Sequence, residues 1–251
     1  MSTKPTLIFL PGAWHSPSVY DAVISKLTTY GYPSQALPLQ AIIGRPAVTT
    51  LQPDIDALNT AVLAQVEAGK DVIVVGHSWS GMIVGGALEG LSKTARQKEG
   101  KKGGVVKLAF IAAFVPLEGV SLIQAFGGGI PDFYDVKEPW VSALMPIPLF
   151  YHDLPTDEAE SWAAKLAPHS YATKFLGTER CSWREIPSSY LLCEDDRAIP
   201  PRVQEAMVET CRKEGAGMDI VRVVSGHSPF LSRVEETVRW LRGVAGEDVG
   251  V

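Results

Sequence analysis

The chain has 251 residues, a hydrophobic content of 46% and a formal net charge of −5. These values predict a globular protein with one large core rather than a disordered or fibrous chain. Because the charge is negative and no basic cluster forms a face, we do not expect nucleic acid as a partner. No apolar run reaches the roughly 18 residues that cross a bilayer, so no membrane span is expected.

Three cysteines, Cys181, Cys193 and Cys211, are too few for a disulfide framework. Cys193 lies within an apolar strand pattern, which predicts a buried free thiol. The amino-terminal apolar run, 7–10, is too short for a signal-peptide core and ends at Pro11. We therefore expect a cytoplasmic protein, either a monomer or a homodimer.

Short apolar runs alternate with helical stripes at both ends of the chain. Apolar residues at 51, 55, 58, 62 and 66, for example, are spaced for one face of a helix. Strands that alternate with helices predict an α/β fold with a mostly parallel sheet and helices on both faces. In chain order we predict strand 6–10, helix 19–30, strand 34–37, loop 38–53, helix 51–68, strand 71–76, helix 82–95, strand 105–115, strand 187–193, helix 200–214, strand 218–224 and a last helix at 234–244.

The alternation stops in residues 117–183, which are rich in glycine, proline and aromatic residues. Within them only 157–166 has a helical pattern, with Thr156 as its cap. We expect a mainly helical cap, inserted between core segments 1–116 and 184–251. Any single aromatic residue in this segment is accounted for by packing inside the cap. As a group, however, these residues predict an apolar pocket. The candidates for its lining are Phe126, Phe133, Tyr134, Trp140 and Phe150.

A candidate nucleophile lies between the buried strand 71–76 and the helix that follows it. The sequence Gly-His-Ser-Trp-Ser-Gly, residues 76–81, has the small residues of a sharp strand–turn–helix corner that exposes Ser78. Strained backbone is expected at this serine, and Gly76 and Ser80 must be small because strand and helix nearly touch. The alternative is a Gly/Ser turn with an incidental serine.

A serine hydroxyl needs a base to take its proton and a carboxylate to orient that base. His227 follows the last predicted strand, so it lies at the same sheet edge as Ser78. His77 is adjacent to the serine, but its side chain is expected to point away from the corner. His15, in the first loop, is a further histidine within reach of the pocket.

The orienting acid comes from the loop one strand earlier, where Glu194, Asp195 and Asp196 are consecutive. We prefer Asp196, with Asp195 as the alternative. The order serine, acid, histidine along the chain is the one expected after such a corner.

Acyl transfer also needs hydrogen-bond donors for the oxyanion. The amide of Trp79, directly after the serine, supplies one, and the amide of Ala13 in the first loop is the expected second. Neighbouring Gly12, Trp14 and His15 are candidates for substrate contact. No histidine pair has ligand spacing with a carboxylate, so we expect neither a metal nor another cofactor.

These motifs resemble the α/β-hydrolase superfamily. The resemblance rests on residues 9–16 (FLPGAWHS), 76–81 (GHSWSG), the Asp196 loop and Gly226-His227, and it covers nearly the whole chain. The most similar branch contains the plant methylesterases and hydroxynitrile lyases with their microbial relatives. It implies Ser78, Asp196 and His227 as catalytic residues and the amides of Ala13 and Trp79 as oxyanion hole; the Ile-Pro pair at 199–200 selects Asp196 over Asp195.

Two departures from this branch bear on the reaction. Its cyanohydrin lyases have a lysine directly after the catalytic histidine and a threonine in the first loop, where this chain has Ser228 and Gly12. Lyase activity of that kind is therefore disfavoured, and the small residue at 12 agrees with the esterases. Pro11 replaces a histidine at the loop's opening, which we interpret as neutral for catalysis.

The sequence thus predicts a serine hydrolase that cleaves a carboxylic ester or lactone of a small to medium apolar or aromatic molecule. One alternative uses the same triad for C–C bond cleavage, decarboxylation or cyclisation. Another is a ligand receptor or carrier without turnover.

Overall fold

A computed structural model describes residues 4–250 of the chain. Its main element is a six-stranded parallel sheet in the order β2-β1-β3-β4-β8-β9. The predicted α/β fold with a mostly parallel sheet is therefore confirmed. The strands are β1 (Thr6–Leu10), β2 (Ser34–Ala36), β3 (Asp71–His77), β4 (Gly104–Ile111), β8 (Ser188–Cys193) and β9 (Met218–Val223).

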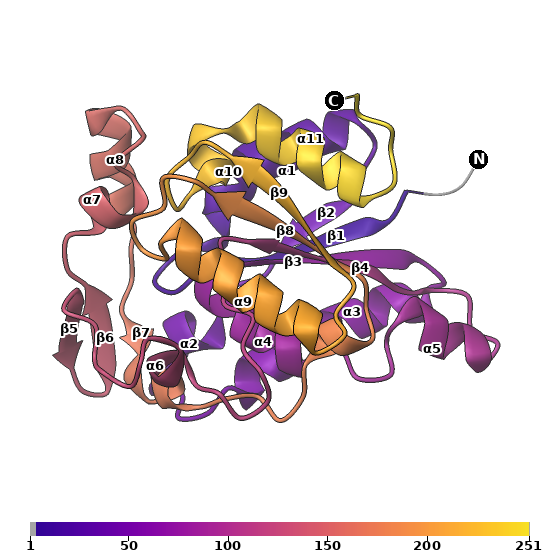
Figure 1. The fold of residues 1–251 in the computed structure, drawn as a ribbon, viewed down its shortest axis with the longest axis horizontal. Coiled ribbons are helices and arrows are strands. Elements are labelled where there is room, and N and C mark those ends of the chain that lie inside the picture. The colour runs from indigo at the N-terminus through magenta and orange to yellow at the C-terminus, as the bar shows by residue number, and fades with distance from the viewer. Residues whose placement is uncertain (1–3, 251) are drawn as a thin grey trace.

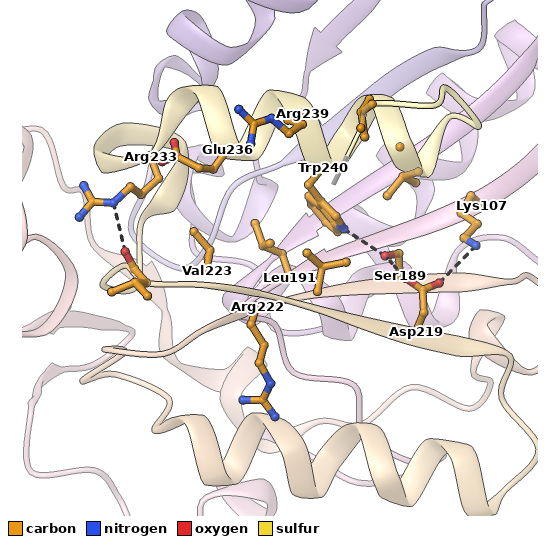
Figure 2. A pocket seen from close by; sticks show the side chains of 16 residues that line it. Lys107, Ser189, Leu191, Asp219, Arg222, Val223, Arg233, Glu236, Arg239 and Trp240 are labelled. Carbon is orange, nitrogen blue, oxygen red and sulfur yellow. Dashed lines mark hydrogen bonds and ion pairs between the residues drawn. The ribbon is translucent and has the colours of Figure 1, made fainter.

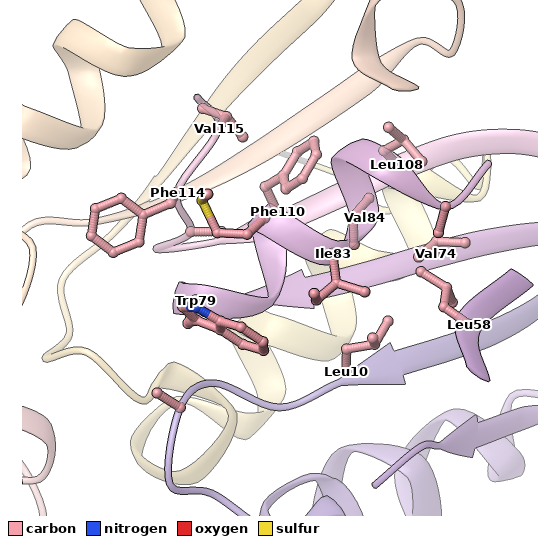
Figure 3. Close-up of a cluster of buried hydrophobic side chains, with 14 of the residues drawn as sticks. Leu10, Leu58, Val74, Trp79, Ile83, Val84, Leu108, Phe110, Phe114 and Val115 are labelled. Carbon is pink, nitrogen blue, oxygen red and sulfur yellow. The ribbon is translucent and has the colours of Figure 1, made fainter. Parts of the chain in front are cut away.

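Helices cover both faces of this sheet (Figure 1). Because side chains alternate along a strand, Leu7 of β1 faces one layer and Ile8 faces the other. The first layer holds η1 (Pro17–Tyr20), α1 (Asp21–Thr29), α10 (Pro229–Ser232) and α11 (Val234–Val244). The second layer holds α3 (Gln52–Glu67), α4 (Gly81–Gly86) and α9 (Pro201–Lys213). Figure 3 shows this second core, where Leu10 and Val74 of the sheet pack with Ile83 of α4.

Two predicted elements are shorter than expected. The predicted helix 82–95 ends at Gly86, because two consecutive glycines weaken a helix, and α5 (Lys93–Lys98) begins only after a turn. Ser92 caps α5 by accepting a hydrogen bond from the Ala95 amide at 3.1 Å. The predicted strand 105–115 ends at Ile111, because Ala112 adopts a positive φ of 41° that no strand residue has.

The segment expected as loop 38–53 contains a short helix, α2 (Gln40–Ile43). The carboxylate of Asp54 accepts hydrogen bonds from the amides of Gln40 and Ala41, the first turn of this helix. Helix amides at this position have no partner inside the helix, so a buried acid from α3 satisfies them. The residue that stabilises this helix, Asp54, thus lies outside the helix's own four residues, which is why the local sequence did not predict the helix.

Most of residues 117–183, including 134–170, lies beyond the ends of the strands, at the left of Figure 1, whereas Ser182 near the end of the segment contacts α4. Residues 117–183 form helices α6 (Leu122–Ala125), α7 (Pro146–Phe150) and α8 (Thr156–Ala163), and the 3₁₀ helices η3 (Tyr171–Phe175) and η4 (Ser182–Arg184). They also form an antiparallel sheet of β5 (Tyr134–Lys137), β6 (Trp140–Ala143) and β7 (His169–Ser170). The prediction of a mainly helical cap missed this sheet, because strands of two to four residues are too short to show a period. We call residues 117–183 the cap.

Helix α8 begins one residue before the predicted helix 157–166 and ends three residues before its end. Its cap residue is Pro155, not the predicted Thr156, which is the first residue of the helix. The three cysteines are buried free thiols, as predicted for Cys193. Across residues 4–250, no helix combines the length and the apolar character that crossing a bilayer requires.

Candidate active site

Ser78 directly follows β3 and is the first residue of η2 (Ser78–Ser80), at the corner that leads into α4. Its φ of 54° lies in the left-handed region, which is strained for a residue with a side chain. The corner leaves almost no space. A Cβ on Gly76 would lie 2.9 Å from Val84 Cγ2, and one on Gly81 would lie 1.9 Å from the Phe114 carbonyl oxygen. Glycine at both positions lets the chain turn sharply enough to bring the half-buried serine to the lining of a cavity.

Ser80 replaces the last glycine of the usual corner motif and does more than stay small. Its hydroxyl accepts a hydrogen bond from the His77 amide at 2.9 Å, and two carbonyl oxygens, those of His77 at 2.9 Å and Leu10 at 3.0 Å, lie within reach of its proton. It is fully buried. This one side chain therefore joins the end of β1, where the first loop begins, to the corner that carries Ser78.

His227 and Asp196 form a buried pair at the same sheet edge. His227 Nδ1 lies 2.7 Å from Asp196 Oδ2, and both side chains are almost completely buried. The carboxylate is an acceptor, so Nδ1 carries the proton and the opposite ring nitrogen, Nε2, is left as an acceptor. That is the tautomer a general base requires.

The Asp196 carboxylate is surrounded by donors. Oδ1 accepts from the amides of Ala198 and Ile199, at 2.8 and 2.9 Å, and Oδ2 accepts from Gln204 Nε2 at 3.0 Å. Asp195 points elsewhere: its side chain is 59% exposed and lies against His152. Of the two acids that the sequence left open, the geometry therefore brings Asp196 to the histidine.

Gln204 was missed in the sequence, although it carries a signal. It lies on the buried stripe of α9 with Val208 and Cys211, and a glutamine on a buried stripe needs partners. Its Oε1 accepts from the Cys193 amide at 3.2 Å, and its Nε2 also donates to the Ile199 carbonyl at 2.7 Å. The amide orientation is thereby fixed with a donor toward Asp196.

The neighbouring His77 supports the backbone of His227. Its Nε2 donates to the His227 carbonyl oxygen at 2.9 Å, and the two rings lie 4.6 Å apart between centroids. Burial lowers the pKa of His77 well below its ordinary value, so its ring is neutral. The side chain points away from the corner tip, as expected from the sequence. Among the hydrogen bonds of residues 4–250 none joins Ser78 to His227, although both side chains border one cavity.

Ala13 and Trp79 line the same cavity as Ser78. Trp79 is in the first turn of η2, where a helix offers no acceptor for its amides. The Ala13 backbone is held from its other side, because its carbonyl oxygen lies 2.7 Å from His15 Nδ1. Gly12 packs against the corner: a Cβ there would lie 2.7 Å from His77 Nδ1 and 3.0 Å from Ser78 Cβ.

The cavity above Ser78 has a volume of about 20 Å³ and a mainly aromatic lining. Of the predicted lining residues, five contribute to it: Trp14, Phe126, Phe133, Tyr134 and Phe150. Further lining residues, missed in the sequence, are Phe114, Leu122, Ala198 and Ile199. Phe114 follows β4 and Ile199 follows β8, so the rule that ligands lie beyond the carboxyl ends of parallel strands could have found both.

Three predicted contact residues do not line the cavity. Gly12 lies beneath it, against His77. His15 is buried beside it, with Nε2 bonded to the Tyr151 hydroxyl at 2.7 Å. Trp140 faces away and stacks with the Arg45 guanidinium, 4.3 Å from its ring centroid. The reason is the register of the cap strands, since Val141, the next residue of β6, is the one that is fully buried.

A fully buried lysine lies against the two tryptophans of the site. Lys174 Nζ lies 4.8 Å from the Trp79 ring centroid and 5.2 Å from that of Trp14, and it bonds to His169 Nδ1. Burial lowers the pKa of Lys174 well below its ordinary value, and the charge of Asp54 acts in the opposite direction. The lysine is absent from the cavity lining, so it supports the tryptophan rings rather than contacting a ligand.

A larger cavity, of about 590 Å³, lies elsewhere, between β9 and α11 (Figure 2). Trp240, Leu191 and Val223 lie between the two elements, and the Trp240 indole donates to the Ser189 hydroxyl. None of Ser78, Asp196 and His227 lines it, so its size alone does not make it the reaction site. No group of three metal-ligating side chains is positioned to hold an ion in the part of the chain that the structure describes.

A parallel sheet with a strained serine after its third strand, and a histidine–aspartate pair from its last loops, is typical of the α/β hydrolases. The comparison with known families agrees: the chain belongs to the alpha/beta hydrolase family, whose sequence profile matches residues 7–240. The chain is 32% identical to the alpha/beta hydrolase nvfD of Aspergillus novofumigatus, over 99% of both chains.

Solved structures share the fold. A pyrethroid hydrolase from Sphingobium faniae superposes with a TM-score of 0.75 at 22% identity, covering 97% of this chain and 98% of that one. Polyneuridine aldehyde esterase gives a TM-score of 0.71 at 18% identity, covering 96% of this chain and all of the other. At these identities the likeness demonstrates the common fold and leaves the substrate open.

Proposed function

We propose that this α/β hydrolase is a serine esterase or lactonase that works through an acyl-enzyme. The observation that carries the proposal is the strained backbone of Ser78 at a cavity that His227 also lines, with Asp196 Oδ2 2.7 Å from Nδ1 of the imidazole. A serine, a histidine and an aspartate are the three groups that acyl transfer by this mechanism requires.

In this mechanism Ser78 Oγ attacks the carbonyl carbon as His227 Nε2 takes its proton. The Asp196 carboxylate stabilises the resulting imidazolium, and the amides of Ala13 and Trp79 stabilise the oxyanion. The imidazolium then gives its proton to the leaving alkoxide, which leaves an ester on Ser78. Water, deprotonated by the same imidazole, releases the acid and restores the serine.

The proposed substrate is a small to medium apolar or aromatic ester. Trp14 and Phe150, with centroids 5.7 Å apart, stack at the cavity, and Phe150 lies 5.6 Å from the His227 ring. Aromatic walls of this kind favour ligands that bring apolar surface and few charges. The names of the compared structures, a hydrolase and an esterase, agree with this reaction class.

The test is a panel of p-nitrophenyl esters and lactones, with Ser78→Ala as control. We expect hydrolysis of apolar acyl or aryl substrates, labelling of Ser78 by a fluorophosphonate, and a loss of kcat of about 10⁶-fold in the variant. Intact protein that neither hydrolyses the panel nor accepts the label contradicts the proposal.

The alternatives have distinct outcomes in the same test. Turnover of a β-keto substrate with no ester hydrolysis points to triad-dependent C–C cleavage, decarboxylation or cyclisation. Tight ligand binding that survives Ser78→Ala without any product points to a receptor or carrier. Ser228, whose buried Oγ has no hydrogen-bond partner among residues 4–250, has no ammonium group, so this position next to His227 offers no cation to a cyanide leaving group.

A further inference from the structure

Three consecutive cap residues, 151–153, each contact a different loop of the site. We call these residues, which follow α7, the clasp. The three loops follow β1, β8 and β9, and they carry the proposed oxyanion donor, acid and base. The contacts are Tyr151 Oη to His15 Nε2 (2.7 Å), His152 Nε2 to Asp195 Oδ2 (2.9 Å), and the Gly226 amide to Asp153 Oδ2 (2.7 Å).

The first contact fixes the loop after β1. His15 Nδ1 faces the Ala13 carbonyl at 2.7 Å, and because a carbonyl only accepts, Nδ1 carries the proton. Burial lowers the pKa of His15 to about 4, so Nε2 is unprotonated near neutral pH and accepts from the Tyr151 hydroxyl. A cap hydroxyl therefore sets the ring that holds the peptide of Ala13, the proposed oxyanion donor.

The third contact fixes the loop of the base. The amide of Gly226, the residue before His227, donates to the Asp153 carboxylate. A Cβ on Gly226 would lie 2.7 Å from Asp153 Oδ1 and 2.8 Å from His152 Cε1, so the glycine backbone packs directly on the clasp. The second contact acts in the same way on the acid, since Asp195 precedes Asp196.

The small volume of the cavity indicates that these contacts matter when a substrate enters. About 20 Å³ holds roughly one water molecule, so an ester substrate enters only if lining residues move. Five residues of this lining belong to the cap: Leu122, Phe126, Phe133, Tyr134 and Phe150. Two further bonds join the cap to the loop after β1: Trp14 Nε1 donates to the Val141 carbonyl at 2.9 Å, and the Ala167 amide donates to the Trp14 carbonyl at 2.9 Å. Movement of the cap therefore reaches the proposed oxyanion donor through its neighbour.

We propose that Tyr151, His152 and Asp153 are positioning residues that couple the position of the cap to the geometry of the oxyanion hole, acid and base. The catalytic groups are then fully aligned only when the cap occupies the position in which these three contacts form. This inference rests on the proposed hydrolase function, but the contacts that it invokes have a readout that does not need turnover.

The test uses Tyr151→Phe and Asp153→Ala, which each remove one contact, and Asp153→Asn, which keeps an acceptor for the Gly226 amide. Asp157→Asn, an exposed acid in the first turn of α8, is the matched control. On the best ester of the panel we expect kcat to fall roughly 10- to 100-fold in the first two variants, since small misplacements of reacting groups have effects of this size. KM changes far less, because the clasp does not line the cavity.

Rescue and coupling separate positioning from general damage. Asp153→Asn and Asp157→Asn should stay within about threefold of the parent protein, because each keeps its backbone contacts. The double variant of Tyr151→Phe and Asp153→Ala should lose less than the product of the single losses, as expected for groups that act as one unit. Unchanged kcat in both single variants, at unchanged melting temperature, overturns the inference.

Hydrogen exchange on the same proteins tests the contacts without any substrate. Tyr151→Phe should speed exchange in residues 12–15 and Asp153→Ala in residues 225–228, whereas Asp157→Asn should speed neither. Exchange that stays at the parent rate in both loops also overturns the inference. If exchange responds as expected while the parent protein hydrolyses no ester, the clasp stands and the hydrolase proposal fails.

Discussion

Replacing Asp196 by asparagine tests the proposed triad most directly, because every group around this carboxylate is a donor. The amides of Ala198 and Ile199 face one oxygen, and Gln204 Nε2 and His227 Nδ1 face the other. An asparagine brings an NH₂ group, which must point at one of these two pairs. Gln204 cannot turn its oxygen toward it without losing its bonds to the backbone around it.

The lower-cost orientation leaves the asparagine oxygen on the two backbone amides and points the NH₂ at the histidine. His227 Nδ1 must then become an acceptor, so the proton moves to Nε2, the nitrogen that should receive the Ser78 proton. A triad with the wrong tautomer loses about 10⁴-fold in kcat, which is about 5.5 kcal/mol of barrier. The asparagine NH₂ also faces Gln204 Nε2, and two donors cannot bond to each other. This lost hydrogen bond should lower the free energy of unfolding by about 1–3 kcal/mol.

The assay is steady-state hydrolysis of the best p-nitrophenyl ester, with Asp195→Asn as the neighbouring comparison. Asp195 is 59% exposed, and asparagine there still offers an acceptor to His152, so its kcat should stay within about threefold. A greater loss in Asp195→Asn than in Asp196→Asn, with both proteins folded by circular dichroism, would show that the acid has been assigned to the wrong residue.

Further predictions concern the corner and the buried histidines. Gly81→Ala should abolish folding or lower the melting temperature steeply, because its Cβ would lie 1.9 Å from the Phe114 carbonyl oxygen; a melting temperature near that of the parent contradicts the packing described. Ser80→Gly removes a hydroxyl with three backbone contacts and should lower the free energy of unfolding in urea by about 1–3 kcal/mol, whereas no change would mean that the glycine of the usual motif serves equally well. Acidification from pH 6.5 to 4 should also destabilise the fold. Burial lowers the pKa of His15 to about 4, so this histidine is protonated at a lower pH in the folded state than in the unfolded chain. The free energy of unfolding should therefore fall by about 3 kcal/mol between pH 6.5 and pH 4. Two other buried histidines shift in the same direction, and Asp54, whose pKa burial raises to about 6, opposes them, so the urea midpoint should be lower at pH 4.5 than at pH 7.

The residues proposed for the chemistry could be found in the sequence because each lies in the loop or turn that follows a strand. Ser78 follows β3, Asp196 follows β8 by three residues, and His227 follows β9 by four. Parallel strands end at one edge, so the pattern that predicts the strands also predicts which loops meet. Local spacing was therefore enough to bring three distant residues together.

The side chains that hold the proposed catalytic residues in place could not be predicted from the sequence in the same way. Tyr151 and His15 are 136 positions apart, and nothing in either local pattern indicates that they meet. The cap strands are too short to show a period, so neither their register nor the outward direction of Trp140 was predictable. Sequence patterns indicate where a chain buries a face, but not which partner, far along the chain, covers it.

This difference has a physical consequence for how the enzyme class can vary. The strained serine and the histidine–aspartate pair belong to the sheet, whose geometry β3, β8 and β9 fix by their parallel register. The walls of the cavity come from both parts of the chain, and the cap supplies five aromatic or aliphatic residues to them: Leu122, Phe126, Phe133, Tyr134 and Phe150. The cap also contacts the loops after the strands through side-chain hydrogen bonds at 151–153. A cap of different sequence can therefore reshape the pocket at little cost to the chemistry only if it keeps equivalent contacts to the three loops. We therefore predict the outcome of replacing the cap of this chain by the cap of a relative. Fluorophosphonate labelling of Ser78 should survive only if the new residues at 151–153 provide the same hydrogen-bond donors and acceptors as the clasp.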